Sequence, residues 1–130
     1  MTSKSLTIFA LSIFIAPLFS AFAKADQALN INDTAPAFFI AEFIIKDSES
    51  IKPYSAKVLS TLAAFGGEFM VRRGKTASLE GSDINGDIVI IKFPSMEKAL
   101  GWYNSPEYSE IRPIRHKAAS TRAYIVEGLL

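Results

Sequence analysis

The 130-residue sequence contains no cysteine, a single histidine and almost no net charge, at +1 with 14 basic and 13 acidic residues. The absence of cysteine excludes disulfides, zinc-thiolate sites, iron-sulfur clusters and thiol catalysis. The balanced charge lacks the basic field that sequence-independent nucleic-acid binding requires, so we expect no nucleic-acid partner. One histidine and scattered carboxylates match no metal-site spacing, and no glycine-rich segment fits a phosphate-binding loop. We therefore expect neither a metal nor a cofactor.

What the N-terminus does have is a long apolar run. Residues 6–22 are almost wholly apolar and follow a short start that contains a lysine, as in a secretory signal peptide. Small residues at the end of the run predict cleavage after Ala23 or Ala25. The alternative is an uncleaved membrane anchor. It is less favoured because Pro17 interrupts the run, which is also shorter than the roughly 20 residues of a membrane span.

The sequence thus divides into a cleaved signal peptide at 1–25, a polar leader at 26–36 and a folded domain at 37–128. Its 49% hydrophobic and 12% aromatic content is ordinary for one globular domain and too high for a disordered chain. We expect an exported bacterial protein, periplasmic or secreted, that makes no membrane contact after cleavage.

Along the domain, the spacing of apolar residues alternates between the period typical of strands and the period typical of helices. The run AFFIAEFII at 37–45 predicts a buried strand. From Ser50 onward, apolar residues recur every three or four positions until Gly66, which predicts a helix capped at Ser50 or a neighbour. The remaining pattern predicts strands at 68–72, 87–93 and 122–127 and helices at 96–104 and 105–119, the last kinked or split by Pro113.

This order of elements is that of the ferredoxin-like α+β fold, βαββαβ, a four-stranded antiparallel sheet with helices on one face. Alternation places one set of side chains under the helices and the other set on the open face. The residues assigned to the open face are Phe38, Ile40, Glu42, Ile44, Met70, Arg72, Ile88, Ile90 and Lys92. Such a face is too apolar to remain in water. We therefore predict a homodimer that packs sheet against sheet as a dimeric α/β barrel.

Three charged residues on the predicted open face need partners, because a buried charge must be paired or serve a ligand. Glu42 and Lys92 belong to neighbouring strands and are predicted to form a cross-strand pair. Arg72 is then left over, and its guanidinium suits a carboxylate, either that of Glu80 in the following loop or that of an anionic ligand. The pairing with Glu80 is favoured, since structural ion pairs are the commoner case.

Aromatic side chains and the single histidine complete the candidate residues. Aromatic residues at helical spacing more often form core or pocket wall than catalytic groups, and this applies to Tyr54, Trp102, Tyr103 and Tyr108. Tyr103 and Tyr108 flank a helix break, so one hydroxyl can face a cleft between helix and sheet. His116 is a candidate general base or haem ligand. Its place in a basic run late in a helix favours a solvated helix terminus instead.

Several short motifs occur together in a fixed order. They are TLAAFGG at 61–67, VRRGK at 71–75, FPSMEKAL at 93–100 and WYNSPEY at 102–108. With this order and spacing, the domain at 37–128 resembles the bacterial family known as domain of unknown function thirteen-thirty, of the dimeric α/β-barrel type. The resemblance implies the fold and a homodimer but no settled activity. Related dimeric α/β-barrel families include cofactor-independent monooxygenases, muconolactone isomerases and haem-degrading enzymes, which implies a small-molecule pocket.

Two functions agree with these interpretations. The first is binding or transformation of a small organic molecule, acidic or aromatic, in a pocket between sheet and helices. Its candidate ligand-binding residues are Arg72, Glu80, Tyr54, Tyr103, Tyr108 and His116. The alternative is a non-catalytic dimerisation module in which the same charges are structural. A haem-degrading role for His116 ranks third, and whether the protein is an enzyme stays open.

Overall fold

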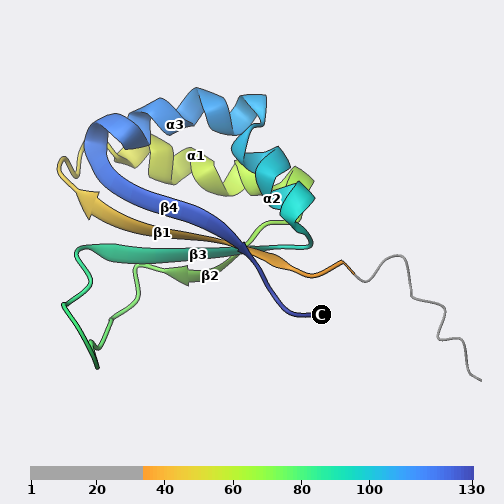
Figure 1. The fold of residues 1–130 in the computed structure, drawn as a ribbon. Helices are drawn as coiled ribbons and strands as arrows, with labels where there is room; N and C mark the ends of the chain where they lie inside the picture. Colours follow the sequence, from red (N-terminus) through yellow and green to blue (C-terminus); the bar gives the residue numbers. More distant parts are fainter. Residues whose placement is uncertain (1–33) are drawn as a thin grey trace, which may run out of the picture.

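Four antiparallel strands form one sheet in the order β2-β3-β1-β4, and the helices cover one face of it in the computed structural model, which describes residues 34–130 (Figure 1). The elements are β1 (Ala37–Ile45), α1 (Lys52–Leu62), a 3₁₀ turn η1 (Ala63–Phe65), β2 (Glu68–Arg72), β3 (Asp87–Phe93), α2 (Met96–Tyr103), α3 (Pro106–Ala118) and β4 (Ala119–Glu127). The predicted ferredoxin-like α+β fold is confirmed. The predicted signal peptide and most of the predicted leader lie outside the described residues.

The central strand β1 shows the alternation that its sequence predicts. Ala37, Phe39, Ala41 and Phe43 are buried under the helices, while the intervening side chains remain partly exposed on the open face. β1 pairs with β3 on one side and with β4 on the other. Residues of β3 and β4 therefore point their side chains to the same face as the β1 residues that they lie opposite. The apolar core therefore lies between the sheet and the helices.

The helix ends largely follow the predicted capping residues. The hydroxyl of Ser95 accepts a hydrogen bond from the backbone N–H of Lys98, and that of Ser105 accepts one from Tyr108. Gly66 ends the first helical segment with a φ of 65°, the left-handed conformation that glycine favours. α1 begins after Ile51, the neighbour of Ser50, without a side-chain cap.

Two predictions near the C-terminus can be compared with the structure. Pro113 was predicted to kink or split the last helix, and the split does not occur, because α3 continues through Pro113 as one helix. Pro113 is exposed, so the carbonyl that its missing N–H leaves unpaired can be hydrated. β4 begins at Ala119, before the predicted start at Arg122, because Ala119 pairs with Ile45 at the end of β1.

An irregularity in β2 changes the face on which its last residues lie. Phe69 and Val71 pair with consecutive residues of β3, which leaves Met70 as an extra residue in a β-bulge. Arg72 consequently lies opposite Val89, a buried residue on the helix-facing side. The prediction that Arg72 lies on the open face is wrong, because one inserted residue reverses the face of every later residue.

Within residues 34–130, none of the helices combines the length and the apolar composition that spanning a bilayer requires.

Candidate functional site

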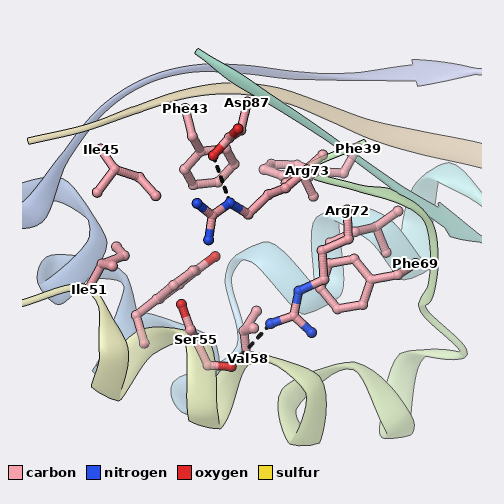
Figure 2. A pocket seen from close by; sticks show the side chains of 13 residues that line it. Phe39, Phe43, Ile45, Ile51, Ser55, Val58, Phe69, Arg72, Arg73 and Asp87 are labelled. Carbon is pink, nitrogen blue, oxygen red and sulfur yellow. Dashed lines mark hydrogen bonds and ion pairs between the residues drawn. The ribbon is translucent and has the colours of Figure 1, made fainter. Parts of the chain in front are cut away.

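A cavity of about 130 Å³ lies between α1 and the sheet (Figure 2). Its apolar wall comes from the helix-facing positions of β1, β2 and β3 and from the facing side of α1. These residues are Phe39, Phe43, Ile45, Ile51, Val58, Phe69, Val89 and Ile91. Its polar residues are Tyr54, Ser55, Arg72, Arg73 and Asp87. An apolar cavity with a few convergent polar groups is the usual form of a small-molecule site.

Arg72 reaches this cavity because of the bulge in β2. Its Nη2 donates a 3.3 Å hydrogen bond to the backbone carbonyl of Ser55 on α1, and its guanidinium lies 4.9 Å from the ring centroid of Phe69. Figure 2 shows the side chain extending from the strand toward α1. Arg72 therefore crosses one edge of the cavity, with further guanidinium donors available to a ligand.

Arg73 and Asp87 form a second polar group, which the sequence analysis did not identify. Arg73 Nε donates a 2.7 Å hydrogen bond to Asp87 Oδ2, and the two side chains are 58% and 35% exposed. Figure 2 places this pair at the end of the cavity beside Phe43. The doublet RR at 72–73 and the acid at the start of the next strand were visible in the sequence. Only the strand pairing joins them.

Tyr54 brings a phenol to the cavity from α1. Its hydroxyl lies 3.3 Å from that of Tyr108, and both side chains are buried. Burial raises the pKa of Tyr54, and the neighbouring Tyr108 raises it further. Burial also raises the pKa of Tyr108. Both phenols are therefore neutral at pH 7 and can donate or accept hydrogen bonds.

A buried cation, Arg115, lies behind the cavity. Arg115 is only 1% exposed, and its guanidinium is 5.6 Å from the ring centroid of the cavity residue Phe43. Its Nη2 donates a 3.0 Å hydrogen bond to His116 Nε2, while its Nε has no hydrogen-bond partner among the described residues. Its basic neighbours in the sequence predicted a solvated helix terminus instead. Its spacing from Tyr108 and Ile111, on the buried side of α3, was the signal that was missed.

His116 lies on the exposed side of the last turn of α3 and does not line the cavity. Its Nε2 accepts the hydrogen bond from Arg115, which requires a neutral ring. Partial burial, together with the adjacent charges of Arg115 and Arg112, lowers the pKa of His116. The location agrees with the predicted helix terminus rather than with a place in the cavity.

The other predicted site residues are not brought to the cavity. Glu80 is exposed in the loop after β2 and forms no ion pair with Arg72, so the predicted pairing is wrong. Tyr103 lies at a separate shallow hollow between α2 and β4, beneath the guanidinium of Arg112 at 4.5 Å. Tyr108 packs behind Tyr54 in the core and does not line the cavity.

The predicted pair between Glu42 and Lys92 is also wrong. The register places Glu42 directly opposite Arg122 of β4, and the two side chains form an ion pair. Lys92 lies opposite Phe38, four positions along β1 from Glu42. Two residues on neighbouring strands form a pair only where the register places them opposite each other.

A metal site finds no support in residues 34–130, where no three histidine, cysteine, aspartate or glutamate residues cluster closely enough to hold an ion. The polar groups of the cavity are two guanidinium groups, a phenol, the hydroxyl of Ser55 and one carboxylate already engaged by Arg73. Such a set can hold an organic anion by hydrogen bonds and ion pairs.

Comparisons with known proteins agree with the fold. Residues 36–129 match the family model described as Domain of unknown function (DUF1330). No protein of curated function matches the chain.

Solved structures of similar fold include the methylated RPA0582 protein, with a TM-score of 0.61 at 16% identity over 75% of this chain and 83% of that one. A second crystal structure of RPA0582, a protein of unknown function from Rhodopseudomonas palustris, has a TM-score of 0.59 at 16% identity over 74% and 84% of the two chains. SnoaB, a cofactor-independent oxygenase from Streptomyces nogalater, has a TM-score of 0.53 at 13% identity over 75% and 96%. At these identities the likeness is one of fold alone.

Proposed function

We propose that this chain, which belongs to the DUF1330 family, binds a small organic molecule, acidic or aromatic, in the cavity between α1 and the sheet. The family description names no activity, so the proposal is argued from the cavity itself. The single observation that supports this most is the convergence of Arg72 and Tyr54 on one apolar cavity. Arg72 comes from β2 and Tyr54 from α1, so two different elements bring polar groups to the same cavity. The similarity to SnoaB supports the fold but does not extend to its activity.

The size and wall of the cavity limit the ligand to a compact body. A cavity of about 150 Å³ lined by aliphatic and aromatic side chains holds one benzene molecule, and the volume here is about 130 Å³. Three phenylalanine rings line it, those of Phe39, Phe43 and Phe69. A single ring or a short branched chain fits these walls.

The charges at the cavity favour an anion. Two guanidinium groups face one carboxylate, and the Tyr54 phenol is neutral at pH 7, with a pKa that burial raises further above its usual value. A ligand with one negative charge would neutralise the remaining positive charge of these lining residues. We therefore assign to the cavity the binding of small organic acids. Turnover would require a reacting group that the ligand or a second reactant supplies.

Replacing Arg72 by alanine is expected to weaken binding of benzoate, used as a probe, by about 10- to 100-fold, the equivalent of one lost charge-assisted hydrogen bond. Stability should change little, because Arg72 is exposed and makes one long hydrogen bond to the backbone. Isothermal titration calorimetry gives the affinity and thermal unfolding gives the stability. The matched control is Lys75→Ala, which removes the same charge from an exposed loop position outside the cavity.

Equal losses in Arg72→Ala and Lys75→Ala would mean that general charge, not the cavity, attracts the probe. A wild-type protein that binds neither benzoate nor the similarly sized cyclohexanecarboxylate and benzyl alcohol would contradict the proposed function. In that case the non-catalytic dimerisation module becomes the better interpretation.

A second copy of the chain is proposed to cover the open face of the sheet. Large apolar side chains are exposed there, namely Ile44, Met70, Tyr124 and Val126. The same face carries two acids and two bases, Glu42, Glu68, Lys92 and Arg122, as the strand registers show. An apolar face with balanced charges can meet its own copy about a two-fold axis without repulsion.

Ile90→Lys is expected to convert the dimer to a monomer at micromolar concentration, because it places a charge near the middle of the open face. Sedimentation velocity measures the change. The control Leu59→Lys adds the same charge at an exposed position of α1 and should leave the dimer intact. A wild-type protein that is monomeric at every concentration tested would contradict the proposal.

A further inference from the structure

One residue of the cavity, Arg73, has a left-handed backbone conformation and a side chain held by an ion pair. We propose that Arg73, positioned by Asp87, recognises the carboxylate of the ligand and thereby selects monocarboxylic acids with a compact apolar body. This inference rests on the proposed function, since it names the group that gives that cavity its specificity. Arg73 contacts the ligand, whereas Asp87 acts through Arg73 and is a positioning residue.

The backbone of Arg73 directs its side chain to the cavity. Its φ of 56° is the only positive value at a non-glycine residue in the described part of the chain, and side chains disfavour this conformation because of steric crowding. The conformation is fixed by a 2.9 Å hydrogen bond from the Arg73 backbone N–H to the carbonyl of Ile88. Without the turn, Arg73 would fall on the face opposite to that of Arg72. Local strain that the surroundings impose is most common at functional sites.

The side chain of Arg73 presents a free pair of donors. Asp87 Oδ2 accepts the hydrogen bond from Nε at 2.7 Å, and neither Nη atom of Arg73 has a hydrogen-bond partner among the described residues. In Figure 2 these two nitrogens extend beyond the ion pair into the space between the sheet and α1. Two parallel N–H donors on a planar guanidinium match the two oxygens of a carboxylate, which a single ammonium group does not.

Asp87 is itself held in place by the sheet. It is the first residue of β3 and pairs with Phe43 of β1, whose ring lines the same cavity. The strand pairing therefore fixes the backbone from which the carboxylate extends toward Arg73. Its contact with Nε fixes the plane of the guanidinium, which reduces the side-chain entropy lost when a ligand binds.

The combined charge of the polar groups favours a ligand with one negative charge. Among the residues that line the cavity, Arg72 and Arg73 contribute two positive charges and Asp87 contributes one negative charge. The positive charge of Arg115 lies behind the wall, 5.6 Å from the ring centroid of Phe43. A neutral ligand leaves the donors of Arg73 without a charged partner. A dianion brings its second carboxylate toward Asp87 or into the phenylalanine wall, and both are unfavourable.

The test measures benzoate, its neutral analogue benzyl alcohol and the dianion phthalate by titration calorimetry. Wild-type protein is expected to bind benzoate at least about tenfold more tightly than either analogue, since a carboxylate engages two charge-assisted donors. Arg73→Lys should remove most of this preference while leaving benzyl alcohol affinity unchanged, because lysine keeps the charge but loses the paired donors.

The positioning role of Asp87 is tested by comparing Asp87→Asn with Asp87→Glu. Asp87→Asn should weaken benzoate binding several-fold without changing benzyl alcohol binding, because the loss of a positioned guanidinium outweighs the removal of one negative charge. Asp87→Glu should restore part of the preference. A purely structural role for Asp87 would lower the affinity for both probes equally. That result would overturn its assignment.

The outcomes separate this inference from the proposed function. If wild-type protein binds benzoate and benzyl alcohol equally, or if Arg73→Lys keeps the preference for benzoate, the assignment of Arg73 is wrong and the cavity still binds small molecules. If wild-type protein binds none of the three probes, the proposed function itself fails. Loss of preference in Arg73→Lys with retained benzyl alcohol binding supports the inference.

Discussion

Replacing Trp102 by alanine is expected to lower the free energy of unfolding by about 3–5 kcal/mol, the usual cost of removing a large buried aromatic side chain. Trp102 is fully buried and lies against several rings, with centroid distances of 5.2 Å to Phe39, 5.3 Å to Phe93 and 4.1 Å to Tyr108. Its Nε1–H donates a 2.9 Å hydrogen bond to Thr61 on α1. The indole therefore connects α2 with the sheet and with both other helices.

Urea unfolding followed by circular dichroism measures this loss. Fluorescence is unsuitable because Trp102 is the single tryptophan of the chain. The control Trp102→Phe keeps a ring in the core but loses the hydrogen bond to Thr61, so its cost should be clearly smaller. A loss below about 1 kcal/mol in Trp102→Ala would contradict the role of the indole at the centre of the core.

Replacing Arg115 by methionine is expected to raise the free energy of unfolding, by on the order of 1–4 kcal/mol. Arg115 is almost completely buried, and the described residues offer its guanidinium a neutral imidazole but no carboxylate. The Nε atom has no hydrogen-bond partner there. Removing a cation from water costs several kcal/mol, which one neutral hydrogen bond and a ring at 5.6 Å do not offset. Methionine fills similar volume without that cost.

The same substitution should reduce benzoate affinity, because the positive charge behind Phe43 and Tyr54 contributes to the field in the cavity. A gain in stability together with a loss of binding is typical of residues kept for function. The control Lys117→Met removes a charge from an exposed position in the same turn of α3 and should change neither quantity appreciably. Lower stability of Arg115→Met than of wild type would show that the guanidinium is fully paired in solution.

Local patterns in the sequence predicted most of the fold. Alternation in β1 gave the correct two faces, and the capping residues Ser95, Ser105 and Gly66 gave the correct helix ends. These features depend on a few neighbouring residues, so they can be read without knowing the rest of the chain. Pro113 lies inside α3 without ending it, since an exposed helix tolerates a proline when the freed carbonyl is hydrated.

The candidate site was only partly predictable. Tyr54 was identified from its helical spacing, and Arg72 was identified as a charge that needs a partner, but on the wrong face. The bulge at Met70 decided that face, and nothing in five residues of β2 distinguishes a bulged strand from a regular one. Arg115 was missed because its basic neighbours outweighed its spacing on the buried side of α3.

The fold class, the order of the elements and the presence of an apolar open face on the sheet could therefore be predicted from the sequence alone. These follow from periodicities that each segment carries within itself. The tertiary structure alone decided which charges meet. It paired Glu42 with Arg122, turned Arg72 and Arg73 to one cavity and placed Asp87 beside them. The physical reason is that register joins residues far apart in the chain, and a shift of one residue exchanges the two faces of a strand.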